Sequence, residues 1–129
     1  MIDAKELRIG NWLEYLGKYV QANTSIIHAV SRIVHPSEMY NPIPLSSEIL
    51  EKCGFKDNGV RIVGSNEVIE WMLGDYDAKI ERDCTGKSLE YVLHSDEWGN
   101  IEKSIEVKYV HQLQNIHFAL TNEELIYTP

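Results

Sequence analysis

The most unusual hydrophobic pattern of the chain is a helix-length stretch without charge, residues 109–122 (YVHQLQNIHFALTN). Across the whole chain 25% of the residues are charged. Large apolar side chains recur in this stretch at the spacing of one helical face. They are Tyr109, Leu113, Ile116 and Leu120. The pattern therefore predicts a helix over residues 109–119, with Leu113, Ile116 and Leu120 buried against a sheet.

The other side of this predicted helix carries amides and imidazoles, among them His111, Gln112 and Asn115. A surface helix usually places Lys and Glu on its wet side. Amides form hydrogen bonds without the desolvation cost of a full charge, so this face is suited to being covered. We expect the cover to be either the proline-rich segment around Pro42 or a second subunit. Gln112 and Asn115 are accordingly predicted to be less exposed than ordinary surface amides.

The N-terminal pattern, residues 7–34, is typical of β structure. Two short strands flank Leu16, Gly17 and Lys18, which predicts a hairpin with a three-residue loop. Residues 26–30 and 33–34 continue with β-branched side chains. A Gly-Asn pair before an apolar strand resembles the opening of small SH3-like barrels. An SH3-like N-terminal β unit is therefore one interpretation of this region.

A second, shorter helix is predicted after a proline-rich break. Ser46 or Ser47 is suited to cap its start, and Gly54 to close it in the left-handed conformation. Glu48 in the first turn and Lys52 in the last turn complement the helix dipole. These signals agree with one another, so the boundaries of this helix are well defined.

The alternation of apolar and polar residues in the middle of the chain predicts strands joined by turns. Asn66–Leu73 suits either a helix or a strand, and we interpret it as a strand. The other expected strands cover residues 60–63, 78–82, 89–94 and 101–107. No linker or repeat divides the chain. The prediction is one α+β domain over residues 1–129, in which two helices pack on a mostly antiparallel sheet.

Size and composition fit a globular protein without a membrane segment. The 129 residues suffice for one hydrophobic core. No window approaches the ~18 apolar residues of a membrane helix, and the charged N-terminus does not look like an export signal. We therefore expect a cytoplasmic protein without membrane contact. Cys53 and Cys84 show no Cys-x-x-Cys spacing and are predicted to be free thiols.

The net charge of -8 is unevenly distributed. Residues 1–44 hold four acids and four bases, whereas residues 45–129 hold sixteen acids and eight bases. An acidic surface repels phosphate backbones, and the chain has no run of Lys or Arg. The charge thus argues against nucleic acid as a partner.

No motif predicts catalysis, a metal site or a cofactor. The Gly-Lys-Ser at residues 86–88 lacks the preceding glycine of a phosphate-binding loop, since Glu81 occupies that position, and is typical of a hairpin turn. His94 with Asp96 and Glu97 could seed a metal site, but a zinc centre needs several ligands at recurring spacings. We predict no catalytic residue, no metal ligand and no cofactor.

Trp98 lies in a polar turn, residues 95–100 (SDEWGN). Its indole either folds back on the neighbouring strand or stays exposed and anchors a partner. Together with the uncharged helix face, it defines a candidate interaction surface. That surface comprises Trp98, His111, Gln112 and Asn115.

Three blocks of the sequence carry a family resemblance: residues 6–12 (ELRIGNW), residues 41–55, and residues 108–125, which are the most specific. In this order they resemble a family of small uncharacterised proteins of phages and prophage-like elements in Bacteroides-type bacteria. The blocks cover about a third of the chain, and residues 58–106 match poorly. The resemblance implies an accessory role in a bacterial or phage setting, and it supplies no activity or catalytic residue.

These observations favour a non-enzymatic interaction or assembly module that binds a protein partner or itself. The alternative is a nucleic-acid-associated accessory protein that uses the N-terminal β unit as a small barrel, which would require a basic face. A third hypothesis is an enzyme whose site is assembled from dispersed residues. That hypothesis would require a deep pocket with convergent polar groups and perturbed pKa values.

Overall fold

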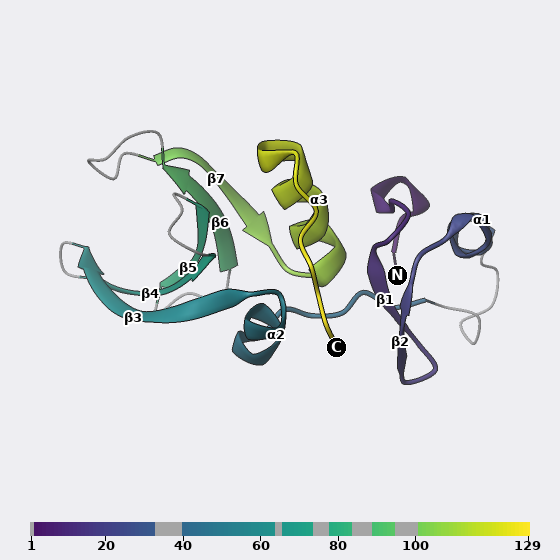
Figure 1. Cartoon of the computed structure of the whole chain (residues 1–129), viewed down its shortest axis with the longest axis horizontal. Helices are drawn as coiled ribbons and strands as arrows, with labels where there is room; N and C mark the ends of the chain where they lie inside the picture. Colours follow the sequence, from purple (N-terminus) through teal and green to yellow (C-terminus); the bar gives the residue numbers. More distant parts are fainter. Residues whose placement is uncertain (1, 33–39, 64–65, 74–77, 84–88, 95–100) are drawn as a thin grey trace. The chain divides into compact units, whose positions relative to one another are not determined.

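The computed structural model describes residues 2–32, 40–63, 66–73, 78–83, 89–94 and 101–129 (Figure 1). The chain forms two compact units. Unit 1 comprises Met1–Pro44, Tyr109–Leu125 and Pro129, and unit 2 comprises Leu45–Lys108 and Ile126–Thr128. Helices and antiparallel sheets confirm the predicted α+β class. That the two units fold as a single domain stays a prediction.

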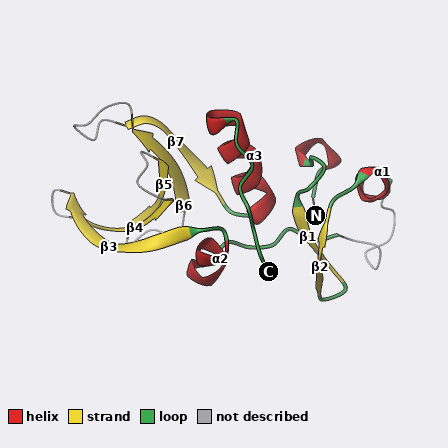
Figure 2. Ribbon diagram, viewed as in Figure 1, coloured by secondary structure: helices red, strands yellow, loops and turns green. Residues whose placement is uncertain are grey.

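Unit 1 combines a β-hairpin with helices (Figure 2). Its elements are η1 (Ala4–Glu6), β1 (Trp12–Tyr15), β2 (Lys18–Gln21), α1 (Thr24–Ser31) and α3 (Val110–Thr121). The strands β1 and β2 are antiparallel, with Leu13 opposite Val20. The predicted hairpin is confirmed, but its loop has two residues, because Lys18 already pairs with Tyr15.

Helix α1 corrects the prediction of β structure for residues 26–30. The side chain of Asn23 caps the helix, since its Oδ1 accepts a hydrogen bond from the Ile26 amide at 2.8 Å. Val30 is buried, and Ile26 and Ile27 pack against the same cluster. Within the described residues, unit 1 therefore contains a hairpin and helices in place of the expected SH3-like β unit.

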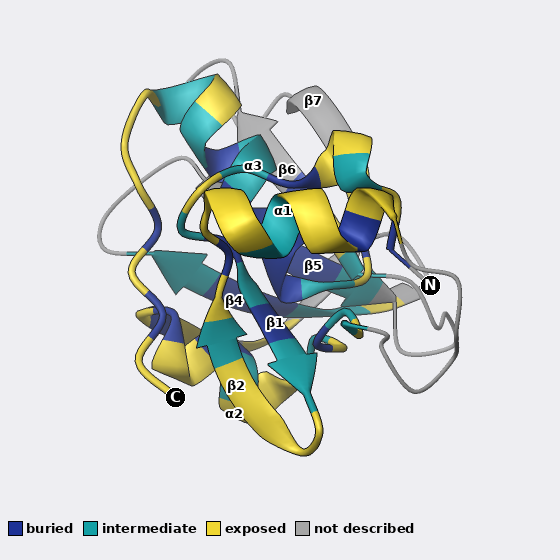
Figure 3. Cartoon of the chain, turned by 90° about the vertical axis from the view of Figure 1, so that its right-hand side faces the viewer, coloured by how far each residue is buried: buried dark blue, intermediate teal, exposed yellow. Residues whose placement is uncertain are grey.

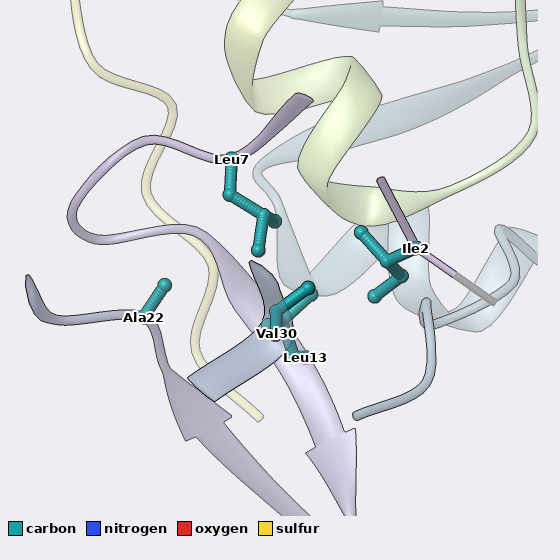
Figure 4. Close-up of a cluster of buried hydrophobic side chains, with 5 residues drawn as sticks. All are labelled: Ile2, Leu7, Leu13, Ala22 and Val30. Atoms are coloured by element: carbon teal, nitrogen blue, oxygen red, sulfur yellow. The ribbon is translucent and has the colours of Figure 1, made fainter. Parts of the chain in front are cut away.

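A small apolar cluster holds the N-terminal part of unit 1 together (Figure 4). The buried side chains come from the N-terminal segment, both sides of the hairpin and α1. They are Ile2, Leu7, Leu13, Ala22 and Val30. Burial of each large aliphatic side chain is worth about 1.5–3 kcal/mol, so this cluster fixes α1 on the hairpin.

Unit 2 is an antiparallel meander with one helix. Its elements are α2 (Ser47–Lys52), β3 (Phe55–Val63), β4 (Asn66–Leu73), β5 (Ala78–Asp83), β6 (Leu89–His94) and β7 (Ile101–Val107). The strand order is β3-β4-β5-β6-β7. The expected strands and the interpretation of Asn66–Leu73 as a strand are confirmed. β3 begins at Phe55, earlier than predicted, and contains a bulge next to Gly59.

One face of this sheet forms the apolar core of unit 2. Trp71, Ile80 and Tyr91 lie opposite one another on neighbouring strands, and all three are buried. Burial raises the pKa of the Tyr91 hydroxyl to about 12 and that of the Cys53 thiol to about 12. Cys53 is a free thiol, as predicted, and Cys84 lies outside the described residues. None of the described helices is long and apolar enough to span a membrane.

The predicted helix boundaries at α2 are confirmed. Ser46 Oγ accepts a hydrogen bond from the Ile49 amide at 3.2 Å, and Gly54 follows the helix with a φ of +92°. A Cβ atom on Gly54 would lie 3.4 Å from Leu73 Cδ1. The space therefore admits a Cβ atom, and the backbone conformation is what favours glycine at this position.

Replacing Gly54 with Val should lower the free energy of unfolding by about 1–2 kcal/mol, because a β-branched residue is strained at positive φ. Gly54→Asn is the matched control, and it should cost less because asparagine tolerates the left-handed conformation. Urea unfolding of the three proteins measures both differences. An equal loss in the two variants would show that space, not backbone strain, sets the preference.

Candidate functional site

The densest polar cluster of unit 1 joins a turn in residues 6–12 to helix α3. The turn is closed by its own groups: the Arg8 amide donates to Asn11 Oδ1 at 2.6 Å, and the Asn11 amide donates to the Arg8 carbonyl at 3.1 Å. Gly10 has a φ of +95°, and its amide donates to the Ala22 carbonyl at 2.8 Å. The turn thus enters β1 with a fixed geometry.

Gln114 of α3 bonds to the backbone of this turn with both ends of its amide. Its Oε1 accepts from the Trp12 amide at 2.9 Å, and its Nε2 donates to the Gly10 carbonyl at 3.2 Å. The residue is only 3% exposed. A carboxamide offers one donor group and one acceptor, as a peptide unit does. Gln114 therefore takes the place of a neighbouring strand beside β1.

Asn115 makes the complementary set of contacts one residue further along α3. Its Oδ1 accepts from Arg8 Nε at 2.8 Å and from Asn11 Nδ2 at 2.9 Å. Its Nδ2 donates to the Glu6 carbonyl at 2.6 Å. Together, Gln114 and Asn115 bind the peptide groups of residues 6–12 from the side of the helix.

Arg8 extends the cluster to the end of α3. Its guanidinium lies 4.6 Å from the centroid of the Phe118 ring, and its Nη1 donates to Glu124 Oε1 at 2.9 Å. The hydrogen bond from Arg8 holds the pKa of the Glu124 carboxyl below its usual value. Because both side chains are partly exposed, this ion pair contributes modestly to stability.

His111 lies at the buried start of the cluster and is 1% exposed. Its Nε2 is 3.3 Å from Glu6 Oε2, which fits a neutral ring that donates from Nε2. Nδ1 is buried without a hydrogen-bond partner. Burial lowers the pKa of His111, and Glu6 opposes that shift. Burial also lowers the pKa of His117, against the opposing effect of Glu123 and Glu124.

The buried side of α3 differs from the one predicted. Leu113 is buried, as expected, but Ile116 and Leu120 are only partly buried. Three of the five buried residues of α3 are polar. The five are Val110, His111, Leu113, Gln114 and His117. Apolar spacing misplaced this face because one amide, Gln114, and two imidazoles, His111 and His117, are buried inside the unit.

The candidate interaction surface is corrected in the same way. His111 is buried, and the amide of Asn115 is bonded within unit 1, so neither lies on a free surface. Gln112 and Asn115 are both partly buried, as predicted. Trp98 lies outside the described residues.

The cover of these amides within the chain differs from the intramolecular cover that the sequence suggested. Gln114 and Asn115 are covered by the backbone of residues 6–12 and not by the segment around Pro42. The proline-rich segment instead meets the start of the helix, where the Val110 amide donates to the Ile43 carbonyl at 2.9 Å. Sequence spacing gives no signal for this pairing, because the partners are about a hundred residues apart.

A row of carboxylates crosses the sheet of unit 2 on the face opposite Trp71. Glu70, Glu81, Glu90 and Glu106 lie directly opposite one another on successive strands. Glu70 and Glu81 are buried, and Glu90 and Glu106 are exposed. Among the described residues, no group of three or more His, Cys, Asp or Glu side chains is placed to hold a metal ion. The row therefore gives no metal centre.

A hollow in unit 1 lies between η1 and α1. Its lining is mainly apolar and comprises Ile2, Asp3, Ala4, Lys5, Val30 and Ser31. The amides, the buried imidazoles and Arg8 do not line it. The other sequence candidates, residues 86–88, Asp96 and Glu97, lie outside the described residues.

In comparisons with protein-family models, curated proteins and solved structures, the chain matches none.

Replacing Gln114 with Glu should lower the free energy of unfolding by about 2–3 kcal/mol. The carboxylate loses the donor to the Gly10 carbonyl and brings a charge into a buried site. Ala119→Glu adds the same charge at an exposed position of α3 and should change stability by only about 0.5 kcal/mol. Chemical denaturation compares the two variants. Equal losses would mean that the amide contact is unimportant.

The stability of the protein should fall as the pH drops below 6.5. His111 and His117 have folded-state pKa values below the ordinary 6.5, so the unfolded chain takes up protons first. The contribution of the two neutral histidines to the free energy of unfolding is fully present above pH 6.5. Below that pH it declines by up to about 1.4 kcal/mol per pH unit for each histidine. Glu124, whose pKa is lowered from 4.5, acts only in a more acidic window.

Denaturant unfolding at several pH values between 6.5 and 4.5 measures this slope. His111→Gln should reduce it, whereas His28→Gln, at an exposed position, controls for the loss of an imidazole. A slope that persists unchanged in His111→Gln would contradict the assignment to this residue.

Proposed function

We propose that this protein is a non-enzymatic interaction or assembly module of the phage or prophage type that its sequence blocks resemble. One observation carries the proposal: the polar side chains gathered in unit 1 bond to one another and to the backbone. Gln114 and Asn115 use their donors and acceptors on residues 6–12. Such groups stabilise a fold and are not arranged to activate a substrate.

The spatial relation of the resemblance blocks supports the same proposal. Residues 6–12 and residues 108–125 are the first and last blocks, and hydrogen bonds from Arg8 and Asn11 join them in unit 1. The start of the middle block pairs with the same unit, through the Asn41 amide and the Glu14 carbonyl at 2.8 Å. The first block, the start of the middle block and residues 109–125 of the last block therefore belong to one structural unit, whereas residues 45–55 belong to unit 2. In this proposal the protein works in the cytoplasm, with a protein partner or itself.

Affinity capture tests whether the protein binds a protein partner. The tagged full chain is expressed in a Bacteroides-type host that carries a prophage. The expected result is a stoichiometric protein partner, or the untagged chain itself, identified by mass spectrometry. Gln114→Glu is a comparison variant, and a partner that requires the folded unit should be lost with it. Capture equal to that of an unrelated acidic protein would contradict the proposal.

The nucleic-acid-associated alternative is tested separately. The full chain should show no appreciable binding to duplex DNA at physiological salt, because its net charge of -8 repels phosphates. Fluorescence anisotropy with labelled duplex DNA measures this, and the same titration at low salt detects a weak electrostatic contact. Micromolar, salt-sensitive binding would favour the alternative over the interaction module.

A further inference from the structure

His111 lies at a place that suits a neutral imidazole and not a charged one. It is the second residue of α3 and is 1% exposed. The start of a helix carries the positive end of the helix dipole, which disfavours a further positive charge. Nε2 donates toward Glu6 Oε2 at 3.3 Å, and none of the described residues forms a hydrogen bond with Nδ1. A proton added to Nδ1 would therefore have no acceptor.

The charged side chain that faces His111 is Glu6 of η1, and it is too exposed to offset this cost. It is 51% exposed, so water screens its attraction for a charged imidazole. On the helix side, the uncharged ring of Tyr109 stacks on the imidazole, with the two centroids 5.9 Å apart. Arg8 and Glu124 pair with each other near the end of α3. Burial accordingly lowers the pKa of His111 by more than Glu6 raises it.

The helix η1 is loosely built and is attached to α3 through one residue. None of its three residues is buried, and so short a helix is not stable by itself. The Glu6 carboxylate meets His111, and the Glu6 carbonyl accepts a hydrogen bond from Asn115 Nδ2 at 2.6 Å. Ile2 and Leu7, on either side of η1, are anchored in the apolar cluster. An exposed segment between two anchors can open locally while the rest of the unit stays folded.

We propose that the contact between His111 and Glu6 is a pH-sensitive latch, in which protonation of the imidazole in mild acid releases η1 from the start of α3. The neutral ring is satisfied when it is enclosed, whereas the charged ring requires a partner for a second N–H group. Because η1 is the exposed element beside the ring, its movement admits the water that supplies this partner. The latch goes beyond the proposed function, since it acts on the fold whatever the protein binds.

Hydrogen exchange of backbone amides in the full chain, between pH 6.5 and 5.0, tests the latch. This range lies above the ordinary pKa values of carboxylates. The Leu7 amide donates to the Ala4 carbonyl at 3.2 Å and reports on η1. The Glu14 amide donates to the Asn41 carbonyl at 2.9 Å and reports on the remainder of unit 1. Protection of each amide is taken relative to its intrinsic exchange rate at the same pH.

The open state has the ordinary histidine pKa of 6.5 and the closed state a lower one. Opening should therefore be constant above pH 6.5, and below it the protection of the Leu7 amide should fall by up to about tenfold per pH unit. A local opening exposes little surface, so this protection should not respond to low concentrations of urea, whereas that of the Glu14 amide should. Equal protection and equal urea dependence at the two amides would overturn the latch, because global unfolding would then explain both.

Three histidine variants assign the response to one ring. His111→Gln should abolish the pH dependence at the Leu7 amide, because glutamine does not titrate in this range. His117→Gln removes the other buried imidazole of α3 and should leave that dependence unchanged. His28→Gln should also leave it unchanged, since this residue lies on α1, which Figure 3 shows as largely exposed. A response that persists in His111→Gln would overturn the proposal.

A titration of the His111 ring by NMR gives a second test that needs no change at the histidine. In the wild-type protein its pKa should lie below 6.5. Glu6→Gln should lower that pKa further, because the amide oxygen still accepts from Nε2 but no longer attracts a charged ring. A wild-type pKa at or above 6.5 would overturn the latch, since protonation would then strengthen the contact with Glu6.

Discussion

Unit 1 depends on the contact between two amide side chains of α3 and the backbone that leads into β1. Gln114 bonds to the peptide groups of Gly10 and Trp12, and Asn115 bonds to that of Glu6. The bonds to Gly10 and Trp12 are partly buried, so the loss of each would cost about 1 kcal/mol. The helix thus supplies the hydrogen bonds that a further strand would supply in a larger sheet.

This contact explains why the helix carries no charge. A peptide edge presents donors and acceptors together, and a carboxamide matches both. Lysine offers only donors and a carboxylate only acceptors, so either would leave part of the edge unsatisfied. The absence of charge therefore predicted a covered amide face correctly. Its partner could not be predicted, because Arg8 and Asn115 are 107 positions apart and no local pattern links them.

Local signals succeeded where they were mutually consistent and failed where two patterns overlapped. The helix from Ser47 to Lys52 has its cap, its dipole charges and Gly54 in agreement, so its bounds followed from sequence. For α1, the β-branched Ile26 and Ile27 suggested a strand, but Asn23 caps a helix. Its apolar side chains then face the N-terminal cluster. Packing and one capping side chain outweighed a weak intrinsic preference.

The amide contact also determines how rigidly the hairpin is presented. The outer edge of β1 is held twice: the Trp12 amide donates to Gln114, and Glu14 exchanges backbone hydrogen bonds with Asn41 at 2.9 and 2.8 Å. A strand bonded on both edges cannot easily bend. Because the loop has only two residues, that rigidity extends to Leu16 at its tip. A side chain fixed in advance loses less conformational entropy when it binds, which lowers the cost of any contact made there.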